Sequence, residues 1–501
     1  MEPVLSVAEM RAVDAAAQRS VPISTLIARA GTAVATEAMS MLGGAYGRRV
    51  VVVAGPGNNG NDGRVAARLL ARRGARVAIV EAGERLAAIV GADLVIDAAY
   101  GTGFRGDYEA PDPGGAPVLA VDVPTGLGAD LGQASPGAVR ATCTVTFGAI
   151  KPGLLLNDGP ELAGRVEVRP IGLPVERVAA AIHLVGNHDV VAMLPGRERS
   201  GHKWSSALMV VAGSPGMYGS ASFVARGAGR SGAGMVRLGI PGADPAALPL
   251  GSAVARVLAP EDFDAQVLED LDRFRALVIG PGLGTSRGTG EAVCRLVASA
   301  NVPTVVDADG LTALGDVSHA AEVIGSRHGA PVILTPHDGE FARMYGRPPG
   351  PDRLGAACDL AARVGAVVLL KGSTTVVASP EGAVLLAASG SARLATAGSG
   401  DVLSGVIGAL LARGVAAAVA AAIGAHVHGV AAGLGRAEGL VAEDLPDLVS
   451  AVLSRAATVR GGAGWPGSER PAGGADPGLA GSERPAGPTV TPGEGGEDSG
   501  G

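Results

Sequence analysis

Aromatic residues are scarce in this 501-residue sequence, where Phe, Tyr and Trp together make up 3%. Few rings are available to stack on nucleic acid bases, so no nucleic acid partner is expected. Cysteine is rare as well: Cys143, Cys294 and Cys358 lie far apart and show no metal-ligand spacing. This pattern argues against a disulfide framework and against a zinc site, and it favours a reducing cytoplasm.

An excess of positive charge is also missing, because 41 Lys and Arg residues stand against 48 Asp and Glu residues, a net charge of -7. Without a broad basic field, binding to a phosphate backbone is not expected. The opening MEPVLSVAEM has no positive segment followed by an apolar one, so we expect no secretory signal. The most apolar stretch, residues 414–425, is too short for a bilayer span and predicts a buried helix. No membrane partner is expected.

The length exceeds what one ordinary core supports and allows two domains followed by a tail. We predict a first domain at residues 1–180 and a second at residues 185–458. Residues 460–501 lose hydrophobic periodicity, are rich in Gly and Pro, and repeat GSERPAG at Gly467 and Gly481. Such a segment buries too little apolar surface to fold, which predicts a disordered tail.

Both domains alternate helices and strands. For the first, the periodicity predicts helices at 6–19, 22–42 and 64–73, and strands at 49–54, 76–80, 93–96, 117–121 and 142–146. This order predicts a Rossmann-like, doubly wound parallel sheet that binds ligands at the carboxyl ends of its strands. For the second, it predicts strands at 207–212, 235–240, 276–279, 303–306, 331–334 and 366–370. A second α/β domain is therefore expected.

A glycine-rich turn at residues 55–63 follows the first predicted strand and precedes a helix. Glycines let the backbone approach a phosphate, and the first amides of the helix stabilise negative charge, so the turn is a candidate anion-binding loop. Gly55, Gly57 and Gly60 also satisfy G-x-G-x-x-G, and Glu81 ends the next strand, as in an NAD-dependent oxidoreductase. A purely structural strand-to-helix turn is the second alternative.

Polar side chains crowd this turn, where Asn58, Asn59 and Asp62 add oxygens that a plain dinucleotide-binding turn lacks. The loops at 97–107 and 121–126 each follow a strand of the same sheet, so the three loops should converge at one edge.

At that edge, Asn59, Asp97 and Thr125 could offer hard oxygen ligands to a cation, which leaves Asp122 free to transfer a proton. Taken alone, an Asp at a strand end is more commonly a turn or cap former, and that structural interpretation stays open.

Three segments here resemble a known family. NNGNDGRVAARLL, DAAYGTGFRGD and DVPTG are similar, in order and spacing, to the signature segments of the NAD(P)H-hydrate epimerase domain over residues 4–174. The resemblance implies contacts to the hydrated cofactor from Asn58, Asn59, Gly60, Asn61, Asp62, Gly101, Thr102, Gly103, Phe104, Arg105, Gly106, Asp107 and Asp122. It also implies that Asn59, Asp97 and Thr125 hold a potassium ion, and that proton transfer by Asp122 assists inversion at C6 of the nicotinamide ring.

One position departs from that family. Its signature usually reads NNGGDG, and Asn61 replaces the second of its adjacent glycines. Because Asn tolerates positive φ better than most residues, a tight turn can persist there.

The second domain has its own glycine-led helix start, AGSGDVLSG at residues 397–405. Asp401 lies in the first turn, where the helix dipole keeps a carboxylate anionic and ready to accept a proton beside a polyphosphate. A simple N-cap with a first-turn charge is the structural alternative. Lys371 follows a predicted strand and adds a cation suited to phosphate. No GxxxxGK[ST] segment occurs, which excludes a P-loop mechanism.

These features resemble the ribokinase-like superfamily, and within it the NAD(P)H-hydrate dehydratase branch. GSPGMYGSASFVARGAGRSGAGMV, IGPGLG, VDADGL, LTPHDGEF, LLKGSTT and GSGDVLSG are similar to segments of that branch over residues 185–456. The resemblance implies nucleotide contacts from Lys371, Gly372, Ser373, Thr374, Thr375 and Gly400, and hydrate contacts from Ser220, Gly282, His337 and Asp401. Ser220 stands where the family tends to have Ala, and Asp338 replaces a usual proline.

Together the two resemblances imply a fused repair enzyme for hydrated NADH and NADPH. Asp401 would take the proton of the C6 hydroxyl as that oxygen attacks the terminal phosphate of ADP, with Mg²⁺, and elimination would then restore the cofactor and release AMP and phosphate. The first domain would interconvert the R and S hydrates. We expect a cytoplasmic homo-oligomer. An ATP-dependent small-molecule kinase, a nucleotide-binding scaffold and an NAD-dependent oxidoreductase remain as alternatives.

Overall fold

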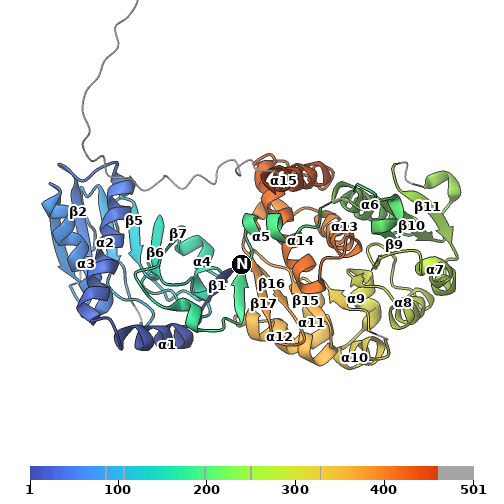
Figure 1. Ribbon diagram of the computed structural model, residues 1–501, viewed down its shortest axis with the longest axis horizontal. Helices are drawn as coiled ribbons and strands as arrows, with labels where there is room; N and C mark the ends of the chain where they lie inside the picture. The colour runs from blue at the N-terminus through green and yellow to red at the C-terminus, as the bar shows by residue number, and fades with distance from the viewer. Residues whose placement is uncertain are drawn as a thin grey trace, which may run out of the picture.

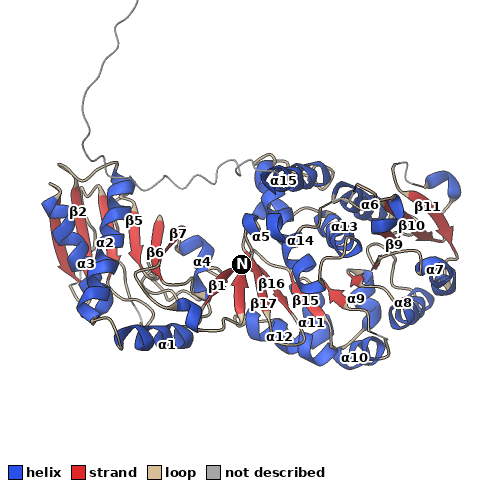
Figure 2. Cartoon of the chain, viewed as in Figure 1, coloured by secondary structure: helices blue, strands red, loops and turns tan. Residues whose placement is uncertain are grey.

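The computed structural model describes residues 1–84, 87–104, 106, 108–196, 199–248, 251–327 and 329–460. These residues form two α/β lobes that lie side by side, one built on a six-stranded sheet and the other on an eleven-stranded sheet (Figure 1). In each lobe the strands lie inside and helices cover them (Figure 2). Arg105 and Asp107 of the predicted site lie outside the described residues, as does the predicted tail beyond Arg460.

All strand pairs of the first sheet are parallel, in the order β3-β2-β4-β5-β6-β7. The strands are β2 (Arg49–Ala54), β3 (Arg76–Glu81), β4 (Leu94–Ala98), β5 (Val118–Val121), β6 (Cys143–Phe147) and β7 (Arg165–Arg169). The helices are α1 (Val7–Gln18), α2 (Ile23–Leu42), α3 (Asn58–Arg72) and α4 (Gly159–Leu162). The order reverses between β2 and β4, so the loops after these strands flank the point where doubly wound sheets bind ligands. The predicted doubly wound sheet is confirmed.

Burial explains why these segments form a parallel sheet. The central strands β4, β5 and β6 are buried at every residue, as expected where both faces of a sheet are covered. α1 begins at a capping box between Ser6 and Glu9, and α2 ends at Gly43 in the left-handed conformation (φ 62). These caps fix two helices that contribute to the wall of the first site.

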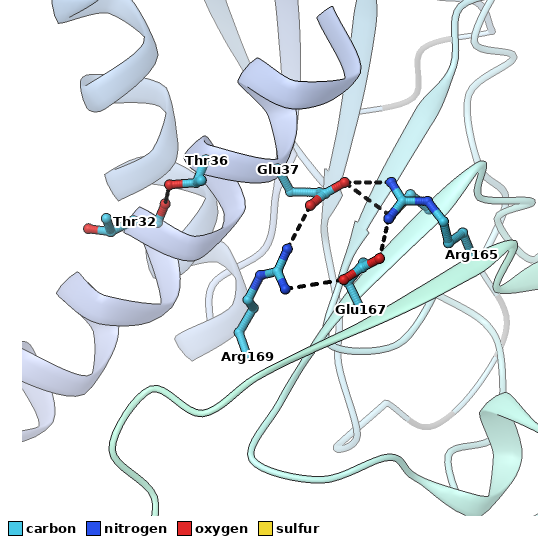
Figure 3. A network of polar contacts seen from close by, with 7 residues as sticks. Thr32, Thr36, Glu37, Arg165, Glu167 and Arg169 are labelled. Atoms are coloured by element: carbon cyan, nitrogen blue, oxygen red, sulfur yellow. Dashed lines mark hydrogen bonds and ion pairs between the residues drawn. The ribbon is translucent and has the colours of Figure 1, made fainter. Parts of the chain in front are cut away.

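An ion-pair network ties the edge strand β7 to α2 (Figure 3). Arg165, Glu167 and Arg169 lie on one face of β7, because alternate residues of a strand point the same way. The buried carboxylate of Glu37 accepts from Arg165 at 2.5 Å and from Arg169 at 2.9 Å, and Glu167 pairs with both arginines. Positive charges on two sides offset the cost of burying Glu37.

The second sheet has the order β1-β8-β17-β16-β15-β14-β13-β12-β9-β10-β11. Its strands are β1 (Glu2–Val4), β8 (Ile182–Leu184), β9 (Ala207–Val211), β10 (Met235–Pro241), β11 (Val254–Leu258), β12 (Ala276–Ile279), β13 (Thr304–Val306), β14 (Val332–Leu334), β15 (Val367–Leu370), β16 (Thr375–Ala378) and β17 (Val384–Ala387). The run from β15 to β11 is parallel, whereas β16 is antiparallel to both of its neighbours.

The helices of this lobe are α5 (Asn187–Met193), α6 (Tyr218–Arg230), α7 (Phe263–Leu271), α8 (Arg287–Ser299), α9 (Asp309–Leu314), α10 (Val317–Gly325), α11 (Asp338–Tyr345), α12 (Arg353–Val364), α13 (Ser399–Ala412), α14 (Ala417–Leu434) and α15 (Leu445–Arg460). α14 is long and apolar enough to cross a membrane, but 67% of it is buried inside the protein, where it packs on α13, α15 and β17. The buried helix predicted from its apolar composition is confirmed.

The first strand of the chain belongs to the second sheet. β1 pairs antiparallel with β8, although the sequence assigns its residues to the first domain. Directly after β1, the Leu5 amide donates to the Ile150 carbonyl of the first lobe at 2.9 Å. The chain thus connects the lobes both at β1 and through the segment between β7 and β8.

Candidate active sites

A cavity of about 460 Å³ opens at the carboxyl edge of the first sheet. Its walls come from α1, α2, the loops after β2 and β4, and the segments after β5 and β6. Of the predicted residues, Asn58, Asn59, Asp62, Gly101, Thr102, Gly103, Phe104 and Asp122 line it. The predicted convergence of these three segments at one sheet edge is therefore confirmed.

The predicted start of the third helix is wrong, because α3 begins at Asn58 rather than at residue 64. The asparagine-rich segment is the first part of this helix and not a loop. Its glycines serve close packing: a Cβ at Gly60 would lie 1.8 Å from the Gly55 carbonyl oxygen, and one at Gly63 would lie 2.4 Å from the Ala98 side chain. Asn61 is exposed on the helix with ordinary helical geometry, so no positive φ is required of it.

Asp97 and Thr125 are held together beneath the cavity. Both are buried, and the Asp97 carboxylate accepts from the Thr125 amide at 2.8 Å and from its hydroxyl at 2.7 Å. Burial raises the pKa of Asp97 to about 6, and the bonds from Thr125 oppose that rise. Asn59 lies beside Gly101, and its buried side-chain NH₂ has no hydrogen-bond partner in the part of the chain that the structure describes. A donor left unsatisfied in a cavity wall is suited to a bound ligand.

Asp122 is the most constrained residue of this site. Its φ is 67, an uncommon value for a residue with a side chain, and such strain clusters at functional sites. Its carboxylate pairs with Lys151 Nζ at 2.5 Å. The Lys151 ammonium also donates to the Thr146 hydroxyl at 2.9 Å and to the Phe147 carbonyl at 3.0 Å, and the residue is 1% exposed. All three of its donors are used.

Sequence analysis missed Lys151, and it also missed Asp14, which lines the cavity from α1. The signal for Lys151 was available, because it closely follows β6, whose carboxyl end lies at the same sheet edge. Burial and the nearby Asp122 carboxylate raise the pKa of Asp14, against an opposing effect of Lys151. Burial and Asp122 also raise the pKa of Asp62, to about 8.

The second site lies at the start of α13. Gly398 precedes this helix in the left-handed conformation (φ 88), and Asp401 lies in its first turn, as predicted. Burial raises the pKa of Asp401 to about 6, whereas a hydrogen bond from Ser220 lowers it. A Cβ at Gly282 would lie 2.9 Å from that of Ser220. Asp401, Ser220 and Gly282 are thus brought together.

Lys371 reaches the same helix turn. A Cβ at Gly400 would lie 3.5 Å from Lys371 Nζ, which pairs with Asp307 at 2.7 Å. Asp307 is buried and its second oxygen accepts from the Ser404 hydroxyl at 2.7 Å. Burial disfavours ionisation of Asp307, but the Lys371 ammonium outweighs it and holds the pKa below its usual value. Sequence analysis missed Asp307, although it lies in the VDADGL segment.

The other predicted residues take varied places. Gly372 and Ser373 are exposed after β15, Thr374 is buried, and Thr375 begins β16. His337 caps α11, where its ring accepts from the Gly339 amide at 3.0 Å.

Asp338, at the proline position of the family, has a partner in Arg353. The guanidinium of Arg353 pairs with its carboxylate at 2.9 Å and also donates to the Lys371 carbonyl at 2.7 Å. The substitution of proline therefore adds an ion pair beside the Lys371 segment.

Comparison with known proteins decides the family. Residues 208–455 match the family model described as NAD(P)H-hydrate dehydratase, and residues 24–88 and 81–153 match that of the YjeF-related protein N-terminus. The bifunctional NAD(P)H-hydrate repair enzyme of Salinibacter ruber is 36% identical, over 90% of this chain and 96% of that protein. The chain belongs to the bifunctional NAD(P)H-hydrate repair enzymes.

A second relative and a solved structure are also similar to this chain. The Mycobacterium tuberculosis repair enzyme is 39% identical, over 83% of this chain and 90% of that protein. A crystal structure of the ADP/ATP-dependent NAD(P)H-hydrate dehydratase of Bacillus subtilis, co-crystallised with ATP and Mg²⁺, is 31% identical, with a TM-score of 0.46 and coverage of 54% of this chain and 97% of that one. The repair family predicted from the sequence motifs is confirmed, and with it a bifunctional epimerase and dehydratase.

Proposed function

We propose that the first site interconverts the R and S hydrates of NADH and NADPH, and that the second dehydrates the S form with ADP, releasing AMP and phosphate. The observation that carries this proposal is the position of Asp401, a partly buried carboxylate in the first turn of α13, with Lys371 over the same turn. A base and a phosphate-binding cation thus share one helix start.

In the second site, Asp401 accepts the proton of the C6 hydroxyl as that oxygen attacks the terminal phosphoryl group. With a pKa of about 6, this carboxylate is largely ionised at neutral pH and still basic enough to take the proton. Lys371 and the first amides of α13 stabilise the charge on the phosphoryl oxygens. Breaking the C6–O bond then releases phosphate and restores the reduced ring.

Mg²⁺ usually binds through one or two carboxylates together with substrate phosphates and waters. Asp307 has both oxygens engaged and Asp401 serves as the base, so Asp309, which lies close enough to raise the pKa of Asp401, is the carboxylate of this site that fits such an ion. The ion would neutralise phosphate charge, while Asp401 and Lys371 act on the substrate.

In the first site, Asp122 assists inversion at C6 by proton transfer, and Lys151 balances its charge. The chemistry of the donors fits a potassium ion at Asp97, Thr125 and Asn59, because a buried carboxylate whose pKa is raised gains from a nearby cation. Among the described residues no three His, Cys, Asp or Glu side chains form a metal cluster, so such an ion would rely on amide and hydroxyl oxygens.

The direct test is to incubate the purified full chain with chemically hydrated NADH and to follow the absorbance of the reduced nicotinamide. Recovery that requires ADP supports the proposal, and substituting ATP tests the nucleotide preference. Asp401→Ala should abolish recovery, whereas Asp122→Ala should slow recovery of the R form alone. A phosphate ester that persists on the product would instead identify a small-molecule kinase.

Three further predictions stay open. We propose a cytoplasmic homo-oligomer, which light scattering on the purified chain and cell fractionation would test. Limited proteolysis would test the predicted division at residues 180–185. Titration with labelled nucleic acid or vesicles would test the expected lack of binding to either.

A further inference from the structure

The first cavity contains more carboxyl groups than one cation can balance. Among the described residues, the ionisable side chains that line it are Asp14, Asp62, Tyr100, Asp122 and Lys151. Lys151 gives its three donors to Asp122, Thr146 and Phe147. Its charge is therefore committed to Asp122, and no other cation among the described residues pairs with Asp62.

Asp62 is a carboxyl of the cavity wall that is available to a ligand. It is 7% exposed, and among the described residues no hydrogen bond or ion pair to its side chain is found. The helix that carries it is fixed in place, because Gly60 and Gly63 on either side press directly on Gly55 and Ala98. A carboxyl that lines a cavity without a partner among the described residues, on a rigidly held helix, points to a bound group that satisfies it.

Asp62 and Asp122 have different surroundings in the cavity. Burial and the neighbouring Asp122 carboxylate raise its pKa to about 8, so Asp62 is protonated at neutral pH. Asp122 is instead ion-paired with Lys151. One cavity thus holds a proton acceptor and a proton donor, the pairing that acid–base catalysis requires.

We propose that Asp62 is a second catalytic residue of the epimerase site and gives its proton to the ring nitrogen N1 of the hydrate. This inference rests on the proposed epimerase function. Asp122 takes the proton of the C6 hydroxyl, a C6=O bond forms, and the C6–N1 bond breaks with its electron pair going to N1, which takes the proton of Asp62. Rotation about C5–C6 exposes the other face of the aldehyde. N1 then attacks C6, and both protons return to the groups that they left.

Ring opening keeps the oxygen on C6. The reaction of the second site is the reason why the first site has to keep that oxygen. That site uses a nucleotide to expel the same oxygen. If the first site expelled it too, loss of a proton from C5 would restore the reduced ring without ADP, and the second activity would be redundant. A neutral acid placed for N1 avoids this outcome, because it promotes cleavage of C6–N1 and not of C6–O.

The test uses Asp62→Asn in the full chain, since Asn keeps the shape but has no proton to give. We expect kcat for R-to-S conversion to fall by about 10²–10⁴-fold with KM changed by less than about threefold. ADP-dependent dehydration of purified S hydrate should stay at the wild-type rate, because its residues lie in the other lobe. In the wild type, epimerisation should decline as pH rises through about 8, and this decline should be absent from the residual activity of Asp62→Asn.

Asp14→Asn is the matched variant, because Asp14 is the other carboxyl of the cavity wall with a raised pKa. It should retain the decline at high pH. The inference is overturned if Asp62→Asn keeps the wild-type kcat, or if Asp14→Asn alone removes the alkaline decline. Hydrate labelled with ¹⁸O at C6 should keep its label on epimerisation, and exchange with each turnover would refute ring opening. If the wild type fails to interconvert the hydrates at all, the proposed function fails before this inference is reached.

Discussion

Each site contains a lysine–aspartate ion pair, but the lysine is the more buried member in the first site and the aspartate is in the second. In the first, Lys151 has a side chain that is 2% exposed and its partner Asp122 is 16% exposed, at a distance of 2.5 Å. In the second, Asp307 is 2% exposed and its partner Lys371 is 22% exposed, at 2.7 Å. In each site one member of the pair is buried. The other member is more exposed and faces the cavity of the first site or the helix start of the second.

The difference in which member is buried matches the difference between the two proposed reactions. The buried member sets the charge and position of its partner, and the more exposed member can meet the substrate. A carboxylate is offered where a proton moves, and an ammonium is offered where phosphoryl charge develops. Backbone strain accompanies both pairs, at Asp122 itself (φ 67) and at Ala308 (φ 51), directly after Asp307.

Among substitutions in these two ion pairs, replacing Asp122, the more exposed member of the first pair, should have the largest effect on a reaction rate. For Asp122→Asn we expect epimerisation to slow by about 10³-fold, within the range for loss of a proton-transfer group. Asn accepts positive φ about as well as Asp, so the backbone at this position should be preserved. The rate is measured by chromatographic separation of the R and S hydrates. Loss of ADP-dependent dehydration in the same variant would show that the two sites are not independent.

Replacing Lys371, the more exposed member of the second pair, should slow dehydration alone. For Lys371→Met we expect dehydration to slow by about 10²–10³-fold, as when one donor to a developing oxyanion is lost. Epimerisation should be unchanged and serves as the folding control. A dehydration rate within tenfold of wild type would mean that the amides of α13 hold the phosphate without this lysine.

The free energy of unfolding should show which member of each ion pair is the more buried one. Removing one partner of a buried ion pair costs about 3–5 kcal/mol, because the remaining charge is left buried. Asp122→Asn strands Lys151 and should destabilise the first lobe more than Lys151→Met, which strands a more exposed carboxylate. For the same reason Lys371→Met should cost more than Asp307→Asn. Urea unfolding of the four variants measures these costs, and the reverse order in either lobe would contradict the assigned roles.

Sequence reasoning predicted the elements that carry strong periodicity and missed those that depend on partners. The apolar strand at β2 and the glycine-led start of α13 were predicted because composition and turn chemistry determine them locally. β7 was missed because its charged residues depend on ion pairs with one another and with Glu37 on a distant helix. β1 was missed because three residues next to a sheet edge give no periodic signal.

The sites divide in the same way. Motif residues such as Asp122 and Asp401 were predicted as site residues from the sequence. The charged residues that pair with the site residues or hold them in position were not predicted. Lys151 and Asp307 act through contacts with residues far away in the chain, and a single sequence does not show those contacts. The helical start at Asn58 was missed because four glycines in the nine residues 55–63 are typical of a loop, although Gly60 and Gly63 are needed for packing.

The smallest expected effect concerns Ser220, which stands where the family tends to have Ala. Its hydrogen bond lowers the pKa of Asp401, so Ser220→Ala should raise that pKa. Dehydration requires the ionised carboxylate and is lost as pH falls through about 6 in the wild type, and the variant should lose it at a higher pH, by less than about one unit. Ser222→Ala, on the same helix, is the matched control and should leave the profile in place. If both variants give the wild-type profile, the Ser220 hydroxyl has no influence on the base, and the second site depends on Lys371 and burial alone.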